Sequence, residues 1–134
     1  MRMIFVNLPV KDLNASKAFF SALGFSFNAQ FTDETAACMV IDDNIFAMLL
    51  TEARFRGFIN GDIAPAGATE VLTCLSCQSR AEVDETLAKA MAAGGKAWKP
   101  TQDHGFMYGA SFQDLDGHVW ELVWMDQAHV QAAA

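Results

Sequence analysis

The chain has 134 residues, a length that fits one domain and leaves no room for a separate nucleotide-binding half. It carries 9 Lys and Arg residues against 16 Asp and Glu residues, which gives a formal net charge of -7 at pH 7. This balance argues against nucleic-acid and anionic-membrane partners, because both need clustered basic residues. No apolar run is long enough for a membrane span and no signal-peptide pattern opens the sequence, so we expect a cytoplasmic protein.

The first half of the sequence predicts the element order β-α-β-β-β. An apolar stretch over residues 3–9 predicts a strand, and Asp12 or Asn14 is a suitable cap for a helix that begins near Leu13. Gly24 is expected to end this helix. Three further strands are predicted at residues 25–31, 36–41 and 45–50.

Residues 51–69 are expected to connect the two halves as a loop rich in Gly, Ala and Pro, with Phe55 and Phe58 anchoring it. The β-α-β-β-β order then restarts. Ser79 and Glu82 have the spacing of a capping box, which predicts the start of the second helix. Four strands are predicted around this helix, at residues 70–76, 96–99, 108–113 and 119–125.

Three cysteines, Cys38, Cys74 and Cys77, suggest free thiols in a reducing compartment. The pair Cys74 and Cys77 has the spacing of a redox or zinc motif. It lies in a predicted strand and not at a helix N-terminus, and no second pair completes a zinc site. We therefore interpret both residues as ordinary thiols, and we expect their side chains to point to opposite faces of the strand.

The doubled element order resembles the vicinal-oxygen-chelate superfamily of glyoxalases, bleomycin- and fosfomycin-resistance proteins and extradiol dioxygenases. The resemblance covers about residues 3–126 and is carried by residues 6–13 (VNLPVKDL), 16–25 (SKAFFSALGF) and 112–122 (FQDLDGHVWEL). It implies one glyoxalase-like domain over residues 1–134, with an α+β fold in which two βαβββ modules form curled mixed sheets around a cup. Module one would span about residues 3–50, the connector 51–69, module two about 70–126 and the tail 127–134.

In metal-using members of this superfamily, the first and last strands of each module supply the metal ligands. These positions fall on Phe5, on Ala47 (or on Met48 if the register differs by one), on Leu72 and on Glu121. Only Glu121 is a usual ligand, whereas protein metal sites commonly have three or more. We therefore expect no tightly bound cofactor, and a divalent metal held through Glu121 remains the disfavoured alternative.

Strand alternation around those positions predicts which side chains face the cup. The predicted lining is mostly apolar with a few polar groups, which is typical of a small-molecule site. It comprises Phe5, Asn7, Ala47, Leu72, Cys74, Ser76 and Glu121, with Phe55 closing over it from the connector.

Three residues are candidates for acid–base chemistry. Glu121 lies in an otherwise apolar strand, where it is either a general base or a structural carboxylate. His104 and Tyr108 lie near a loop at the predicted rim of the cup, where they would assist Glu121, and Asp103 would orient His104. His118 is interpreted as a capping or surface residue, and His129 lies in the tail.

The leading functional hypothesis is that the cup binds a small, partly apolar molecule without a tightly bound catalytic metal. The resemblance implies that the protein is a homodimer. One alternative is a glyoxalase-type lyase or isomerase that acts on a carbonyl compound or a thiol adduct, with Glu121 as the base or metal ligand. The other alternative is a structural or interaction module whose cup is filled by its own side chains.

Overall fold

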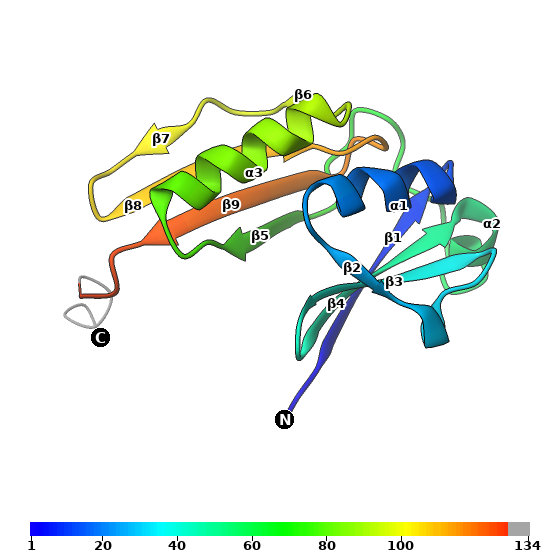
Figure 1. Ribbon diagram of the computed structural model, residues 1–134. Helices are drawn as coiled ribbons and strands as arrows, with labels where there is room; N and C mark the ends of the chain where they lie inside the picture. The colour runs from blue at the N-terminus through cyan, green and yellow to red at the C-terminus, as the bar shows by residue number, and fades with distance from the viewer. Residues whose placement is uncertain (129–134) are drawn as a thin grey trace. The chain divides into compact units, whose positions relative to one another are not determined.

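Each half of the sequence folds into its own mixed sheet with a helix across one face (Figure 1). The computed structural model describes residues 1–128, so the predicted residue His129 and most of the predicted tail lie outside the described part. The chain divides into one unit from Met1 to Ala66 and a second that starts at Gly67. The expected α+β class is confirmed.

The first unit has a four-stranded sheet in the order β1-β4-β3-β2, in which β1 and β4 are parallel and the other pairs antiparallel. Its elements are β1 (Ile4–Val10), α1 (Leu13–Ala22), β2 (Ser26–Asn28), the short 3-10 helix η1 (Ala29–Phe31), β3 (Ala36–Asp42), β4 (Ile45–Thr51) and α2 (Glu52–Arg56).

Local sequence determines where α1 begins and ends. The Asp12 side chain accepts a hydrogen bond from the Ala15 backbone N–H at 3.0 Å, as an N-cap does. Gly24 has a φ of +103°, a conformation that residues with a Cβ rarely adopt, and it follows the helix as predicted. The apolar side of α1, including Phe19 and Phe20, is buried and packs on the sheet.

The second unit has the strand order β5-β9-β8-β6, with β7 also paired to β8. Strands β5 and β9 are parallel, and the other pairs are antiparallel. Its elements are β5 (Leu72–Ser76), α3 (Arg80–Ala92), β6 (Lys96–Ala97), β7 (Gln102–Asp103), β8 (Met107–Gln113) and β9 (Val119–Met125).

Among residues 67–128, α3 is the helix that packs on the second sheet, and it covers one face of it. The predicted capping box is present in a variant form: Ser79 Oγ accepts from the Glu82 N–H, whereas Glu82 Oε2 accepts from the N–H of Gln78, the residue before the N-cap. Val83 on α3 and Trp120 on β9 are almost fully buried, so the core of this unit lies between the helix and the sheet.

Three short elements were not predicted. The 3-10 helix η1 replaces the end of the strand expected over residues 25–31, so that strand is limited to β2. Helix α2 occupies the start of the expected loop because the Thr51 side chain caps it by accepting from the Arg54 N–H. Strand β7 is an edge strand of two residues, and it pairs with the beginning of β8. All three are too short to leave a periodic pattern in the sequence.

Within residues 1–128, none of the helices combines the length and the apolar character that crossing a membrane requires.

Candidate functional site

The open face of the second sheet carries a row of three polar side chains. Cys74 on β5 is paired with Glu121 on β9, and Glu121 is paired with Ser111 on β8. Directly paired residues of neighbouring strands project from the same face of a sheet. The opposite face holds the buried residues Trp120 and Leu122 beneath α3. Three strands therefore bring a thiol, a carboxylate and a hydroxyl side by side, away from the core.

A pocket of about 300 Å³ lies at this row. Its polar side chains include those of Cys74, Ser111 and Glu121, and its walls are largely apolar or backbone. The complete lining is Cys74, Lys99, Pro100, Gln102, Met107, Gly109, Ala110, Ser111, Glu121, Leu122 and Val123. An apolar hollow with a few converging polar groups is the usual composition of a small-molecule site.

One wall of the pocket is held in place by Ser111. Its Oγ accepts a hydrogen bond from the backbone N–H of Lys99 at 3.1 Å and lies 3.5 Å from the carbonyl oxygen of Lys99. These contacts fasten the segment between β6 and β7 to the middle of β8. Ser111 is consequently 7% exposed, although it lies on the open face.

Glu121 is half-buried in the pocket, and no described residue donates a hydrogen bond to its carboxylate or forms an ion pair with it. The pairing places Glu121 on the same face of the sheet as Cys74 and Ser111, and alternation had predicted that it shares a face with Cys74. A carboxylate in this position retains its full capacity to accept hydrogen bonds from a bound molecule.

The two neighbouring cysteines are poor nucleophiles. Burial raises the pKa of the Cys74 thiol, and the negative charge of Glu121 raises it further. Burial and the adjacent Glu82 carboxylate raise the pKa of Cys77 to about 11. Both thiols are therefore protonated at neutral pH, which agrees with the interpretation that this pair is not a redox motif.

Tyr108 does not lie with Glu121. It pairs with Trp124 and therefore projects from the face that α3 covers. Its hydroxyl donates a hydrogen bond of 2.6 Å to Asp84 of α3, and the Arg80 guanidinium lies 5.0 Å from the centres of both aromatic rings. The expectation that Tyr108 assists Glu121 is corrected, because side chains alternate and this one is on the other side of the sheet.

His104 lies on the same face of the sheet as Glu121, but it is far from Glu121 along the strands. Its backbone N–H bonds to the Met107 carbonyl, four residues along β8 from Ser111, which is roughly 14 Å at the usual strand rise. Its ring Nε2 pairs with Gln102 at 3.2 Å. Asp103 does not orient His104, because its carboxylate pairs with Arg80 at 2.7 Å. An acid–base pair of His104 and Glu121 is not formed.

The open face of the first sheet is aromatic. Phe5 and Phe46 are paired and stack with their ring centres 4.9 Å apart, and Asn7 is paired with Met48 on the same face. Asn7 uses its side-chain amide to donate to the Phe5 carbonyl. Ala47 lies on the opposite face and is fully buried. The assignment of Ala47 to the cup is therefore corrected by one residue to Met48, the register alternative.

The remaining predicted lining residues are distributed over both units. Leu72 and Ser76 share the open face of the second sheet with Cys74 and are exposed, but they do not line the pocket. Phe55 is half-buried on α2, which packs against β1 and β4 of the first unit.

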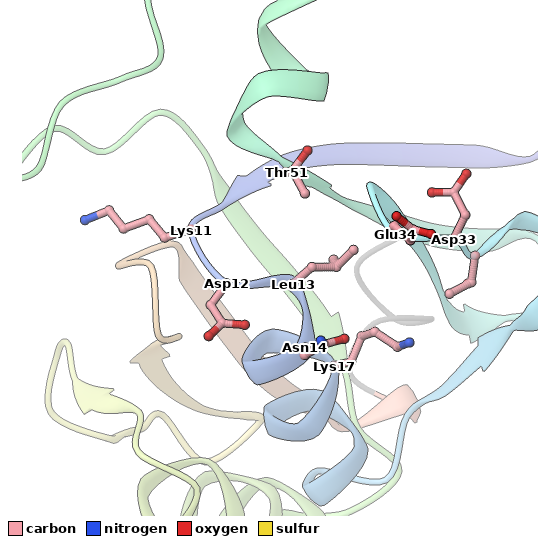
Figure 2. A pocket seen from close by; sticks show the side chains of 9 residues that line it. Lys11, Asp12, Leu13, Asn14, Lys17, Asp33, Glu34 and Thr51 are labelled. Atoms are coloured by element: carbon pink, nitrogen blue, oxygen red, sulfur yellow. The ribbon is translucent and has the colours of Figure 1, made fainter.

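A larger and shallower hollow of about 660 Å³ lies in the first unit at the start of α1 (Figure 2). Lys11 and Lys17 extend to opposite sides of it, so their charges do not converge (Figure 2). The Asp12 and Asp33 carboxylates are used to cap backbone N–H groups at Ala15 and Ala36. This surface therefore has no uncommitted group directed at a common point.

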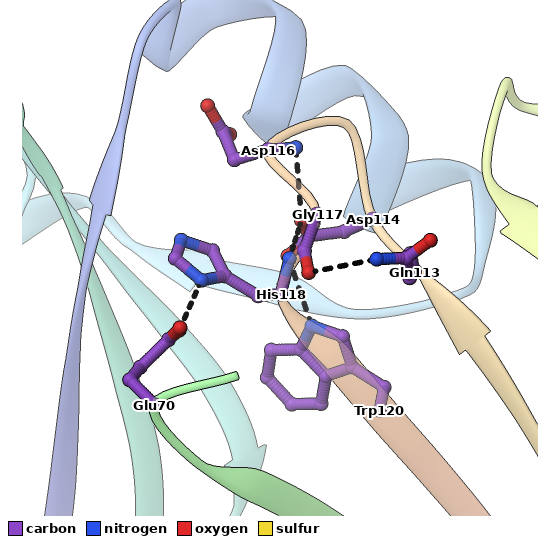
Figure 3. Close-up of polar contacts among 7 residues, drawn as sticks. All are labelled: Glu70, Gln113, Asp114, Asp116, Gly117, His118 and Trp120. Atoms are coloured by element: carbon purple, nitrogen blue, oxygen red, sulfur yellow. Dashed lines mark hydrogen bonds and ion pairs between the residues drawn. The ribbon is translucent and has the colours of Figure 1, made fainter. Parts of the chain in front are cut away.

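His118 belongs to a buried polar cluster (Figure 3). Its Nδ1 lies 2.5 Å from Glu70 Oε1, and its backbone N–H donates to Asp114 Oδ1. Asp114 also accepts from the Trp120 indole N–H and the Asp116 backbone N–H. Burial raises the pKa of Asp114, and the nearby His118 opposes this rise. The cluster forms the turn between β8 and β9, where Asp114 caps the backbone N–H groups. The interpretation of His118 as a capping or surface residue is therefore corrected, because its side chain is buried and contacts Glu70.

The donor set does not fit a divalent metal ion. Of the positions carried over from the superfamily, only Glu121 has a ligand side chain, and its paired neighbours offer a protonated thiol and a hydroxyl. Within residues 1–128, no group of three or more His, Cys, Asp or Glu side chains is placed to hold a metal.

Several pocket residues were missed from the sequence. Gly109 and Ser111 were identifiable, because the turn at residues 114–117 sets the pairing of Ser111 with Glu121 once both strands are assigned. The segment of Lys99 and Pro100 gave no periodic pattern, since it leaves the sheet between β6 and β7.

The fold of the two modules is similar to that of solved glyoxalase and bleomycin resistance proteins. The predicted resemblance to the vicinal-oxygen-chelate superfamily is confirmed by a family model and by solved structures. The model of the bleomycin resistance protein-like N-terminal family matches residues 2–42. No curated protein matches the chain.

Three solved structures illustrate the similarity. The hypothetical protein SA1046 from S. aureus is 27% identical with a TM-score of 0.79, covering 92% of this chain and 94% of that one. A glyoxalase/bleomycin resistance protein/dioxygenase family enzyme from Burkholderia phytofirmans PsJN is 16% identical with a TM-score of 0.77, covering 93% and 99%. The fosfomycin resistance protein FosX from Listeria monocytogenes is 23% identical with a TM-score of 0.68, covering 92% and 93%.

Proposed function

We propose that this protein binds a small, partly apolar molecule in the pocket of its second module. The observation that carries the proposal is the hollow of about 300 Å³ at the paired residues Cys74, Glu121 and Ser111. Its apolar walls exclude water from a ligand, and its polar groups orient one. The fold is compatible with this role, but a fold hosts many functions and does not assign one.

Binding is favoured over a lyase or isomerase reaction by the placement of the candidate acid–base groups. Tyr108 is engaged with Asp84 on the far face of the sheet, and His104 is engaged with Gln102 near the hairpin. Neither His104 nor Tyr108 accompanies Glu121 in the pocket, and the pKa of the neighbouring Cys74 thiol is raised. A general acid must reach the reacting atom within hydrogen-bond distance.

The test is a thermal-shift and titration screen of the full chain with small aromatic and aliphatic compounds, followed by assignment of the affected backbone amides by NMR. We expect saturable binding that shifts the amides of Gly109 and Ser111. The variant Gly109→Val should abolish it, because a branched side chain fits a strand but fills the pocket. The control Ala97→Val, at an exposed position of β6, should bind as the wild type does.

Saturable binding that survives Gly109→Val would place the site elsewhere and contradict the proposal. The same conclusion would follow from a library that produces no saturable shift.

We also propose that the protein is a cytoplasmic homodimer. Support for self-association comes from β1, an edge strand of the first sheet on which Ile4 and Phe5 are 55% and 48% exposed. Exposed apolar side chains on an unpaired edge favour pairing with another chain. Sedimentation analysis tests this proposal: a dimer in the wild type and a monomer in Ile4→Lys are expected, whereas a monomeric wild type would refute it.

A further inference from the structure

The Glu121 carboxylate requires a hydrogen-bonding or charged partner from any molecule that binds in the pocket and covers it. It is half-buried and has neither a hydrogen-bond donor nor an ion-pair partner among residues 1–128. In the free protein, water that enters the pocket solvates this charge. A ligand that displaces the water must supply a partner in its place, because a covered charge without a partner is strongly destabilised.

In the structure, none of the other polar side chains that line the pocket supplies that partner. Ser111 Oγ is committed to the backbone of Lys99. The Cys74 thiol is a weak donor, and Lys99 forms no ion pair with the described residues. A ligand that covers the carboxylate therefore gains by carrying the compensating group itself.

The remainder of the lining favours an apolar body next to that group. Met107 and Val123 lie on the same face of the sheet as Glu121, and Pro100 adds a further apolar wall. Gly109 stands between Ser111 and Met107 on β8, where the missing side chain leaves room above the sheet. The pocket thus offers one charged acceptor beside an apolar surface.

We propose that the ligand is a small apolar amine whose protonated nitrogen donates hydrogen bonds to the Glu121 carboxylate. This inference rests on the proposed binding function and specifies its ligand class. Charge-assisted hydrogen bonds are stronger than those made by a neutral hydroxyl, so an ammonium compensates the covered carboxylate better than an alcohol does. The net charge of -7 also favours the approach of cations over anions.

A matched series of probes tests the proposal: phenethylamine, phenethyl alcohol and phenylacetate share an aromatic body and differ in charge. Their affinities for the full chain are measured by calorimetry at constant ionic strength. We expect the amine to bind about tenfold more tightly than the alcohol, and the acid to bind most weakly.

Two variants locate the effect. Glu121→Gln keeps the size and removes the charge, so it should eliminate the preference for the amine over the alcohol. Glu85→Gln makes the same charge change on an exposed position of α3 and should preserve the preference. A preference that persists in Glu121→Gln, or one that disappears equally in Glu85→Gln, would overturn the assignment to Glu121.

The experiments distinguish a failure of the amine proposal from a failure of the proposed binding function. If the alcohol and the amine bind equally well and both are lost in Gly109→Val, the pocket is a binding site but the ligand class is wrong. If none of the probes binds to the wild type, the amine proposal is overturned, and the broader library then decides the binding function itself.

Discussion

Cys74 and Glu121 are paired across the parallel strands β5 and β9, and the carboxylate adds to the rise that burial causes in the pKa of the thiol. Because of this pairing, the reactivity of the Cys74 thiol depends on the charge of Glu121. A thiol reacts as its thiolate, so a raised pKa slows alkylation at neutral pH.

Glu121→Gln should therefore accelerate alkylation of Cys74. Removing the negative charge lowers the thiol pKa and enlarges the thiolate fraction at a fixed pH below that pKa. We expect a roughly threefold faster reaction with iodoacetamide, which corresponds to about half a pKa unit. Site-resolved mass spectrometry measures the rate.

Cys77 provides the internal control for this experiment. Its pKa of about 11 arises chiefly from burial and from Glu82, so its rate should not follow the charge at position 121. Equal acceleration of Cys74 and Cys77 would indicate a general loosening of the fold and would contradict the coupling.

Tyr108 is the only tyrosine of the chain, which makes its titration directly observable. The hydrogen bond to Asp84 and the charge of that carboxylate hold the Tyr108 pKa above its ordinary value of 10.0. Asp84→Asn should lower the pKa, because the amide favours the neutral phenol less than a carboxylate does. Absorbance of the tyrosinate against pH measures the change.

Glu85→Gln, one residue along α3, is the matched control and should leave the Tyr108 titration where it is. An unshifted titration in Asp84→Asn would mean that the contact between α3 and β8 is not formed in solution.

Much of the fold was predictable because its determinants are local. The Asp12 cap, the Ser79 capping box and the element order depend on short patterns, and each is present in the structure. The faces of β5 and β9 were also predictable, since alternation placed Cys74 and Glu121 together once the strands were assigned. The structure adds that a third strand contributes Ser111 to the same row.

The parts that could not be predicted depend on register and on long-range contacts. Ala47 and Met48 differ by one residue, and a shift of one reverses the face of every side chain on a strand. Tyr108 was placed near Glu121 because it begins a predicted strand beside a loop, whereas its register on β8 directs it toward α3. The salt bridge from Arg80 to Asp103 joins residues far apart in the sequence.

Asp114 makes the stability of the second unit depend on pH. Burial raises its folded-state pKa above the ordinary value of 3.8. The folded state then binds more protons than the unfolded state, so this contribution to stability is present at low pH and is lost as the pH rises through the folded pKa.

Asp114→Asn removes this titration and leaves the Trp120 indole N–H without its carboxylate acceptor. We expect the substitution to lower the free energy of unfolding by about 1–3 kcal/mol at acid pH, where Asp114 stabilises the wild type most. At neutral pH the decrease should be smaller. Urea unfolding of both proteins at several pH values gives the two curves. If the two proteins differed more in their free energy of unfolding at neutral pH than at acid pH, the stated direction of the Asp114 pKa shift would be refuted.

Two glycines of the second unit should respond in opposite ways to the same substitution. A Cβ on Gly95 would lie 2.8 Å from the Ala90 carbonyl oxygen and 3.0 Å from that of Gln113, and both are backbone atoms that cannot move aside. Gly95→Ala should therefore lower the free energy of unfolding by about 1–3 kcal/mol, as overpacking does. Urea denaturation measures it.

Gly109→Ala is the comparison, because the nearest atom to its added Cβ is the Leu122 carbonyl oxygen at an ordinary 3.7 Å. We expect its stability to remain within about 0.5 kcal/mol of the wild type, as at unstrained positions. Since Gly109 lines the pocket, this variant should instead weaken binding of phenethylamine by occupying space. Equal destabilisation by both substitutions would contradict the packing described for the connection between α3 and β6.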